Sequence, residues 1–217
     1  MEMLATATMP DGSCLELLRH DDNFVIQADG HDLMTSYSHG SEEAMMSLAC
    51  PRPRADACIL IGGLGMGYTL AATLDLMSPV GSVVVSELVP EVVEWTRGPL
   101  GPLAGHPLDD PRGHLVVGDV ADVIRDSKSR FDAALLDVDN SPDSFTLATN
   151  SRLYTPEGLA AAQRSLRPRG ALAIWSAGAG GTFEPRLRAA GFTASTHQVR
   201  GRGKRGGHYS IVVGRNR

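Results

Sequence analysis

Residues 58–87 place a glycine-rich turn between two short apolar runs, and this arrangement narrows the fold class of the whole chain. The first run, Ile59–Ile61, passes directly into GGLGMG at residues 62–67, and a helical pattern follows. The second run, Val83–Val85, ends on the acid Glu87. Strand, glycine turn, helix, strand and carboxylate in this order are typical of a nucleotide-binding unit in an open parallel sheet.

The glycine turn has a definite chemical use. Glycines let backbone N–H groups approach a ligand closely at the N-terminus of the following helix. A carboxylate about 20 residues further on can hold two ribose hydroxyls. A tight strand–helix turn in some other α/β protein is the alternative interpretation. The residues of this unit predicted to bind a nucleoside are Gly62, Gly63, Leu64, Gly65, Gly67, Glu87 and Leu88.

Composition argues against several classes of protein. The formal net charge of −5 over 217 residues is unlike that of a dedicated nucleic-acid binder, which is usually basic. No run approaches the roughly 18 apolar residues of a membrane span. Cys14, Cys50 and Cys58 lack metal-ligand spacing and suit free thiols in a reducing compartment. We therefore expect no metal, no membrane and no nucleic-acid partner, and a cytoplasmic location.

The chain divides at residue 50 in our interpretation. Residues 1–50 are predicted to form a short extension of β-hairpin and helix. It comprises a loose tail at residues 1–12, a hairpin over Cys14–Ala28 and a helix over Ser41–Cys50. Such a β element is too small for a core of its own, so we expect it to pack against the remainder. Residues 51–217 are predicted to form the main domain, which contains the glycine turn.

Strands and helices alternate along residues 51–217, which favours an α/β fold with a mostly parallel sheet. The predicted strands are Ile59–Ile61, Val83–Val85, His114–Val117, Phe131–Leu136, Ala171–Trp175, Thr193–Val199 and His208–Val213. The last two are expected to form an antiparallel edge. The basic loop that joins them, Arg200 to Arg205, is interpreted as a solvated hairpin tip, with anchoring of an acidic substrate as the alternative.

A second set of candidate residues follows the third predicted strand. Ligands of open α/β sheets bind beyond the carboxyl ends of the strands, where Gly118 and Asp119 lie. The Asp119 carboxylate can accept from the exocyclic amine of adenine while the N–H of Val120 reaches a ring nitrogen. The alternative is that Asp119 caps the following helix, and both roles can hold together. We add Gly118, Asp119 and Val120 to the predicted site.

The order of these features resembles the class I S-adenosylmethionine-dependent transferases, and more closely the spermidine synthase family of polyamine aminopropyltransferases. GGLGMG stands where that family has a GGGDGG-like run, and Glu87 where it has a ribose-binding acid. DPRGHLVVGDVADVI (residues 110–124) and FDAALLDVDNSP (residues 131–142) resemble its DPR…GD and YDVIIxDSSDP segments. The resemblance covers roughly residues 15–175. It implies a Rossmann-like class I methyltransferase sheet, S-adenosylmethionine or its decarboxylated form as donor, a small-molecule acceptor and, by analogy, a homodimer.

Two departures from the family pattern concern the chemistry. The family's glycine loop carries an aspartate that pairs with the amine of decarboxylated S-adenosylmethionine, and this chain has Gly65 there. The family has a Tyr-His pair directly before a conserved glutamate. In this chain Ser41 and Glu42 stand at the positions of that pair, and Glu43 stands at the position of the glutamate. Because the carboxylate of ordinary S-adenosylmethionine would clash with an aspartate, Gly65 favours ordinary S-adenosylmethionine as the ligand.

The resemblance makes Asp137 the best candidate for orienting or deprotonating the acceptor, because a carboxylate at the end of the fourth strand faces the transferred group in this fold. Asp137 is also predicted to contact the donor. Asp139 points the same way while the chain stays extended, or it builds an Asx turn instead. Tyr154 either walls the acceptor pocket or packs against the sheet. His39 is interpreted as a loop residue, with catalysis as the alternative.

The main hypothesis from the sequence is an S-adenosylmethionine-dependent enzyme that transfers a methyl group to a small nucleophile. The first alternative is aminopropyl transfer from decarboxylated S-adenosylmethionine to an amine. A catalytically silent nucleoside-binding protein is the second. An NAD-dependent dehydrogenase is disfavoured, because no Tyr/Lys or His/Asp arrangement typical of such enzymes accompanies the glycines.

Overall fold

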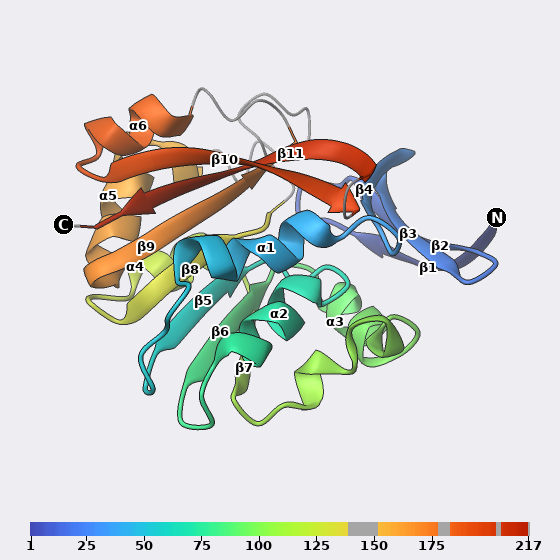
Figure 1. Cartoon of the computed structure of the whole chain (residues 1–217). Coiled ribbons are helices and arrows are strands. Elements are labelled where there is room, and N and C mark those ends of the chain that lie inside the picture. The colour runs from blue at the N-terminus through green and yellow to red at the C-terminus, as the bar shows by residue number, and fades with distance from the viewer. Residues whose placement is uncertain (139–151, 178–182, 203–204, 217) are drawn as a thin grey trace.

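The computed structural model describes residues 1–138, 152–177, 183–202 and 205–216. They form a small N-terminal antiparallel sheet and a larger, mostly parallel sheet covered by helices on both faces (Figure 1). The predicted α/β fold class is thus confirmed. The predicted Asp139 and its neighbours Asn140 to Pro142 lie outside the described residues.

The N-terminal sheet has four strands in the order in which they occur along the chain: β1 (Glu2–Thr8), β2 (Cys14–His20), β3 (Asn23–Ala28) and β4 (His31–Thr35). The predicted hairpin is present as β2 and β3, but the predicted loose tail at residues 1–12 is wrong. β1 pairs with β2, and Ala7 and Met9 are buried. Its small apolar residues alternate with threonines, so the strand depends on its partner rather than on its own propensity.

The main sheet has the order β10-β11-β9-β8-β5-β6-β7. Its strands are β5 (Cys58–Gly62), β6 (Ser82–Glu87), β7 (Gly113–Val117), β8 (Phe131–Leu136), β9 (Leu166–Ser176), β10 (Thr193–Arg202) and β11 (Arg205–Arg215). Strands β7, β6, β5, β8 and β9 are parallel neighbours, and β11 runs antiparallel to both β9 and β10. The last hairpin is longer than predicted, because β10 continues to Arg202 within the predicted basic loop.

Alternation along the strands divides the core into two layers. Side chains such as Ile59, Ile61 and Val85 pack with α1 (Gly40–Ala49), α2 (Tyr68–Leu76) and α3 (Pro90–Arg97). Leu60, Val84 and their neighbours pack with α4 (Val120–Arg125), α5 (Pro156–Ser165) and α6 (Phe183–Ala189). Because successive strand residues point to opposite faces, a sheet covered on both faces needs continuous apolar runs. The segment between α3 and β7, predicted as loop, contains 3-10 turns at Gly101–Ala104 and Pro107–Asp109.

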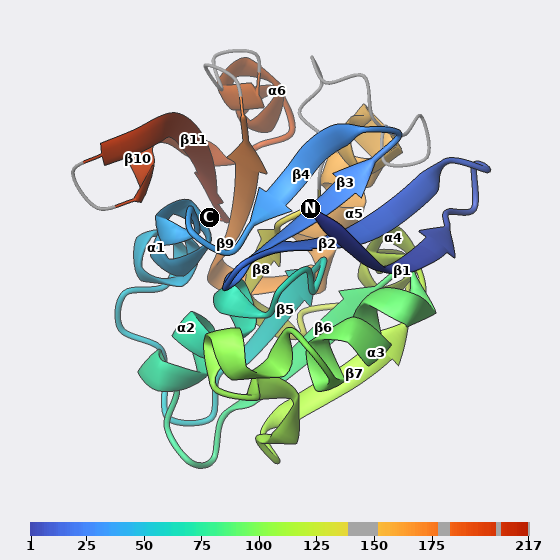
Figure 2. The same cartoon turned by 90° about the vertical axis from the view of Figure 1, so that its right-hand side faces the viewer.

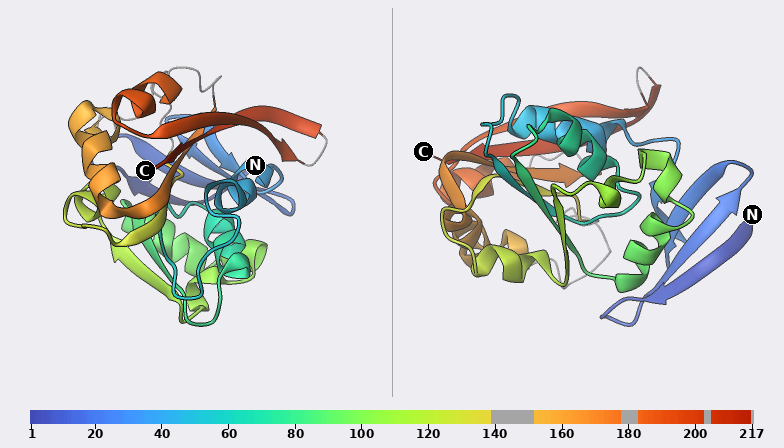
Figure 3. Two further views of the ribbon diagram at one scale, coloured as in Figure 1. Left: turned by 60° about the vertical axis from the view of Figure 1, so that its left-hand side comes forward. Right: turned by 90° about the horizontal axis from the view of Figure 1, so that it is seen from below.

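The N-terminal sheet covers one end of the main sheet (Figure 2). It packs beside α3 (Figure 3, right) through a cluster that joins Leu17 and Ile26 to Val92 and Trp95. The strand order reverses between β5 and β8, since their successors β6 and β9 lie on opposite sides. Ligands of such sheets bind at this switch point, outside the carboxyl ends of the strands. The cluster thus holds the small sheet over the place where a ligand is expected.

Candidate nucleoside and amine site

The glycine turn after β5 brings the backbone of two strands into close contact. Gly63, Gly65 and Gly67 have φ angles of +90°, +50° and +87°, a region that favours glycine. A Cβ on Gly63 would lie 2.3 Å from the carbonyl oxygen of Asp137, and the N–H of Asp137 donates to the oxygen of Gly62 at 2.9 Å. The turn therefore helps to fix the position of Asp137 through contacts with its backbone.

Glu87 ties the same turn to the end of β6. Its Oε2 accepts from the N–H of Leu64 at 2.8 Å, and its Oε1 accepts from the N–H of Val89 at 2.9 Å. Only 7% of Glu87 is exposed, and burial raises the pKa of its carboxyl. Each carboxylate oxygen has a further lone pair, so Glu87 can still accept from a ligand hydroxyl.

A cavity of about 180 Å³ lies at this end of the sheet. Eight residues of the predicted donor site line it: Gly63, Gly65, Glu87, Leu88, Gly118, Asp119, Val120 and Asp137. Gly62, Leu64 and Gly67 do not line it and act in the turn behind it. The remaining walls include Trp175 and residues that the sequence did not indicate, among them Met9, Leu15, Ile26, Ala28, Leu33, Met34, Glu42 and Ser86. The N-terminal sheet thus forms one side of the cavity.

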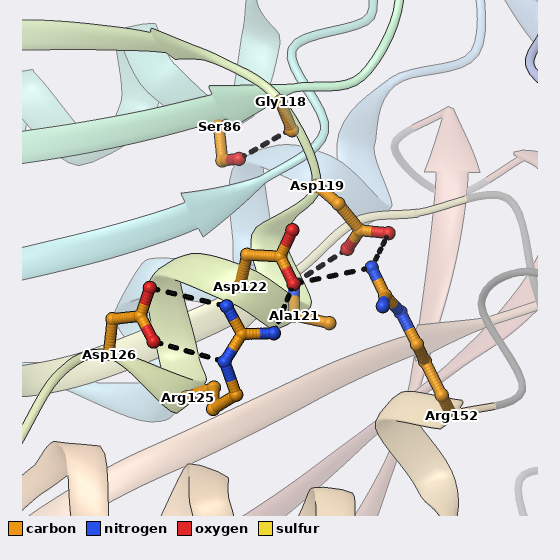
Figure 4. A network of polar contacts seen from close by, with 8 residues as sticks. All are labelled: Ser86, Gly118, Asp119, Ala121, Asp122, Arg125, Asp126 and Arg152. Atoms are coloured by element: carbon orange, nitrogen blue, oxygen red, sulfur yellow. Dashed lines mark hydrogen bonds and ion pairs between the residues drawn. The ribbon is translucent and has the colours of Figure 1, made fainter.

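Asp119 caps α4, as the alternative interpretation expected. Its Oδ1 accepts from the N–H of Ala121 at 2.7 Å, while its Oδ2 forms an ion pair with Arg152 (Figure 4). Figure 4 also shows Arg125 bound to Asp122 and Asp126 in the same network. The Asp119 side chain lines the cavity, and a nucleoside base that used Asp119 would compete with Arg152 for its Oδ2.

Asp137 and Glu42 both line the cavity, and the charge of Asp137 acts on Glu42. The hydroxyl of Thr69 donates to Asp137 Oδ2 at 2.5 Å. Glu42, on the buried face of α1, is 6% exposed and accepts from the hydroxyl of Ser41 at 2.5 Å. Burial, and next the negative charge of Asp137, raise the pKa of Glu42 to about 7. Glu42 is therefore about half protonated near neutral pH.

The glutamate that faces the site is not the one expected from the resemblance. Glu43 is exposed and points to His39, whose Nδ1 lies 2.8 Å from Glu43 Oε1. His39 stacks on Tyr68 with ring centroids 4.0 Å apart. The helical spacing of Glu42, Met45, Met46 and Ala49, all buried, would have placed Glu42 on the inner face.

Gly65 leaves no room for the aspartate of the family pattern. A Cβ at residue 65 would lie 2.8 Å from the Met34 sulfur, which also accepts from the N–H of Met66 at 3.3 Å. Met34 of β4 therefore fills that space. The carboxylates that remain near this part of the cavity come from α1 and β8, as Glu42 and Asp137.

A second cavity, of about 790 Å³, adjoins the first. Leu33, Met34, Glu42 and Trp175 line both cavities, so they form the boundary between them. The second is further lined by Asp32, Thr35, Tyr37, Ser38, Arg202, Gly206, Gly207 and Tyr209. Within the basic loop Arg200 to Arg205, which was interpreted as a solvated hairpin tip, Arg202 thus contributes to a cavity wall.

The structure buries Tyr154 in the core. Tyr154 packs edge-on against Phe183 with ring centroids 4.9 Å apart, and it lines neither cavity. The sequence left open whether Tyr154 walls the acceptor pocket or packs against the sheet, and its position matches packing against the sheet. Within the described residues, no three His, Cys, Asp or Glu side chains are grouped so that they could hold a metal ion. None of the helices described has the length and apolarity needed to cross a membrane.

Comparison of the sequence with known proteins finds no matching family model. A polyamine aminopropyltransferase of Mycobacterium tuberculosis is 36% identical over 115 residues, which cover 51% of this chain and 21% of that protein. A polyamine aminopropyltransferase of Korarchaeum cryptofilum is 31% identical over 120 residues, which cover 55% of this chain and 35% of that protein. The match thus spans about a fifth to a third of the length of these relatives.

Solved structures match over nearly the whole chain. Spermidine synthase from Thermotoga maritima has a TM-score of 0.78 at 19% identity, with 99% of this chain and 73% of that chain covered. Spermidine synthase in complex with the transition state analogue AdoDATO has a TM-score of 0.73 at 20% identity, with 99% and 72% covered. The chain therefore shares the fold of these spermidine synthases, and about half of its length is similar in sequence to polyamine aminopropyltransferases.

Proposed function

We propose that the chain is an enzyme that transfers an aminopropyl group from decarboxylated S-adenosylmethionine to an amine. The relatives that support this proposal are named polyamine aminopropyltransferases, and the structural neighbours are spermidine synthases. They favour aminopropyl transfer, the first alternative drawn from the sequence, and give no support to the main hypothesis of methyl transfer.

One observation on this chain carries the proposal: two neighbouring carboxyl groups, Glu42 and Asp137, line the donor cavity. Decarboxylated S-adenosylmethionine brings a sulfonium and an ammonium but no carboxylate. Ordinary S-adenosylmethionine would bring its own carboxylate towards these acids, and like charges at close range repel. The sequence argument from Gly65 favours ordinary S-adenosylmethionine; in this proposal Glu42 instead supplies, from a different element, the carboxyl group that Gly65 lacks.

The proposed division of work follows from the positions of the side chains. Glu87 and the glycine turn hold the ribose, and Asp119 and Val120 receive the base. Asp137, fixed by Gly63 and Thr69, orients the acceptor nitrogen in line with the carbon–sulfur bond. The new nitrogen–carbon bond forms as the carbon–sulfur bond breaks, and sulfur keeps the electron pair in methylthioadenosine.

Product analysis tests the proposal. The protein is incubated with either donor and a panel of amines that contains both diamines and amino acids, because Asp32 and Arg202 both line the second cavity. Methylthioadenosine formed only from the decarboxylated donor is the expected result. S-adenosylhomocysteine would instead indicate methyl transfer. Donor binding without any product would indicate a silent nucleoside-binding protein, and calorimetric binding of NAD alone would indicate a dehydrogenase.

Replacing Arg152 with alanine is expected to tighten methylthioadenosine binding about two- to fivefold. The Arg152 side chain in the ion pair with Asp119 is half exposed, and exposed ion pairs contribute roughly 0.2–1 kcal/mol of interaction free energy. Its loss frees Asp119 Oδ2 for the exocyclic amine of the base. Isothermal titration calorimetry measures the change.

Arg125→Ala is the matched control for this experiment. Arg125 belongs to the same network but pairs with Asp122 and Asp126, so its removal should leave the affinity unchanged. Weaker binding in Arg152→Ala would contradict the assignment of Asp119 to the base. It would place Arg152 itself in contact with the ligand.

The finer features inferred from the sequence stay predictions. They are a small-molecule amine acceptor, a homodimer, a cytoplasmic location and a division into residues 1–50 and 51–217. Sedimentation of the purified chain would decide the oligomeric state.

A further inference from the structure

Glu42 lies where the two cavities meet. It is one of the four residues that line both, and the only one of these four with an ionisable side chain. The other three, Leu33, Met34 and Trp175, are apolar or aromatic. A donor in the first cavity and an acceptor in the second would therefore react next to the Glu42 carboxyl.

The walls of the second cavity suit a cationic amine on its way to this point. Tyr37, Trp175 and Tyr209 line it, and the rings of Trp175 and Tyr209 lie 5.2 Å apart. Aromatic faces attract ammonium groups. Asp32 adds a carboxylate to the same cavity. An amine held here carries its proton until a base removes it, because free alkylamines are protonated at neutral pH.

The charged and titratable groups that act on Glu42 come from three directions. Asp137 at the end of β8 raises the pKa of Glu42, and His39, just before α1, lowers it. From α2, Tyr68 has its own pKa raised by burial and by the charges of Glu43 and Glu42. Burial is the largest effect on Glu42, and the result is a pKa of about 7. A base of this strength takes up and releases protons readily near neutral pH.

We propose that Glu42 is the catalytic base: its carboxylate takes the proton from the acceptor ammonium at the boundary between the two cavities. This inference rests on the proposed aminopropyl transfer. The nitrogen, freed of one proton, forms the bond to the donor carbon, and sulfur leaves with the electron pair of the carbon–sulfur bond. Glu42 then passes its proton to solvent. Asp137 orients the same nitrogen without taking the proton.

Two neighbouring substitutions test the proposal. Glu42→Gln is expected to lower kcat at least 100-fold, because a positioned base contributes about 10²–10⁴-fold. The kcat of the unmodified protein should rise with pH through about 7, and this dependence should vanish in Glu42→Gln. Glu43→Gln is the matched control, since Glu43 is the adjacent, exposed residue on the same helix. It should keep both kcat and the pH dependence.

The outcomes separate this inference from the proposed function. Methylthioadenosine binding within about threefold of the unmodified protein, by calorimetry, shows that Glu42→Gln is folded and retains its donor site. Full turnover and an unchanged pH profile in Glu42→Gln would overturn the role of Glu42 and leave aminopropyl transfer intact. No turnover by the unmodified protein, with any amine and either donor, would overturn the proposed function and this inference with it.

Discussion

Asp137→Asn is expected to lower kcat about 10²-fold, the cost of a misplaced acceptor, and to leave methylthioadenosine affinity within about threefold. Asparagine keeps the size of the side chain and can still bind Thr69, but it loses the charge that faces the cationic nitrogen. The nucleoside half of the site depends on Glu87 and Asp119, which the substitution does not touch. Steady-state formation of methylthioadenosine, with calorimetry for the product, measures both quantities.

The pH profile gives a second readout for Asp137→Asn. The charge of Asp137 raises the pKa of Glu42, so its removal should lower that pKa and move the acidic limb of the kcat profile to lower pH. Asp132→Asn is the control from the same strand. Asp132 binds the N–H of Cys58 and the guanidinium of Arg167, so its loss should reduce stability but not kcat. A kcat within about threefold in Asp137→Asn would contradict the orienting role.

The main sheet could be predicted because its signals are local. Continuous apolar runs such as Ile59–Ile61 and Val83–Val85 indicate strands that are buried on both faces. The glycines after β5 indicate a turn with positive φ angles, which glycine adopts more easily than other residues. The role of Glu87 could also be predicted locally, because an acid at the end of a buried strand needs hydrogen-bond partners. The structure supplies them as backbone N–H groups of Leu64 and Val89.

The rest of the site depends on contacts between distant segments. Nothing near Met34 indicates that its sulfur fills the space beside Gly65, because 31 positions of chain separate them. The pairing of Asp119 with Arg152 likewise joins residues on either side of β8. Glu42 is different: its helical spacing with Met45 and Ala49 was visible in the sequence, and the family pattern drew attention to Glu43 instead.

Gly63→Ala is expected to destabilise the fold by about 2–5 kcal/mol and to weaken donor binding at the same time. The φ of +90° disfavours any side chain, and the new Cβ would meet the Asp137 carbonyl oxygen at 2.3 Å. This oxygen belongs to the backbone, so it cannot rotate away. Relief requires β5 and β8 to separate at the site where Gly62 and Asp137 share a hydrogen bond.

Gly12→Ala separates the two contributions to this effect. Gly12 has a φ of +91°, but a Cβ on it would meet no atom within 4 Å, so only the conformational cost of about 1 kcal/mol applies. Urea unfolding of both variants gives the difference as the cost of the contact with Asp137. Equal losses of stability in Gly63→Ala and Gly12→Ala would contradict the close approach of the two strands. Since the close approach also positions Asp137, the position of Asp137 would then need another origin.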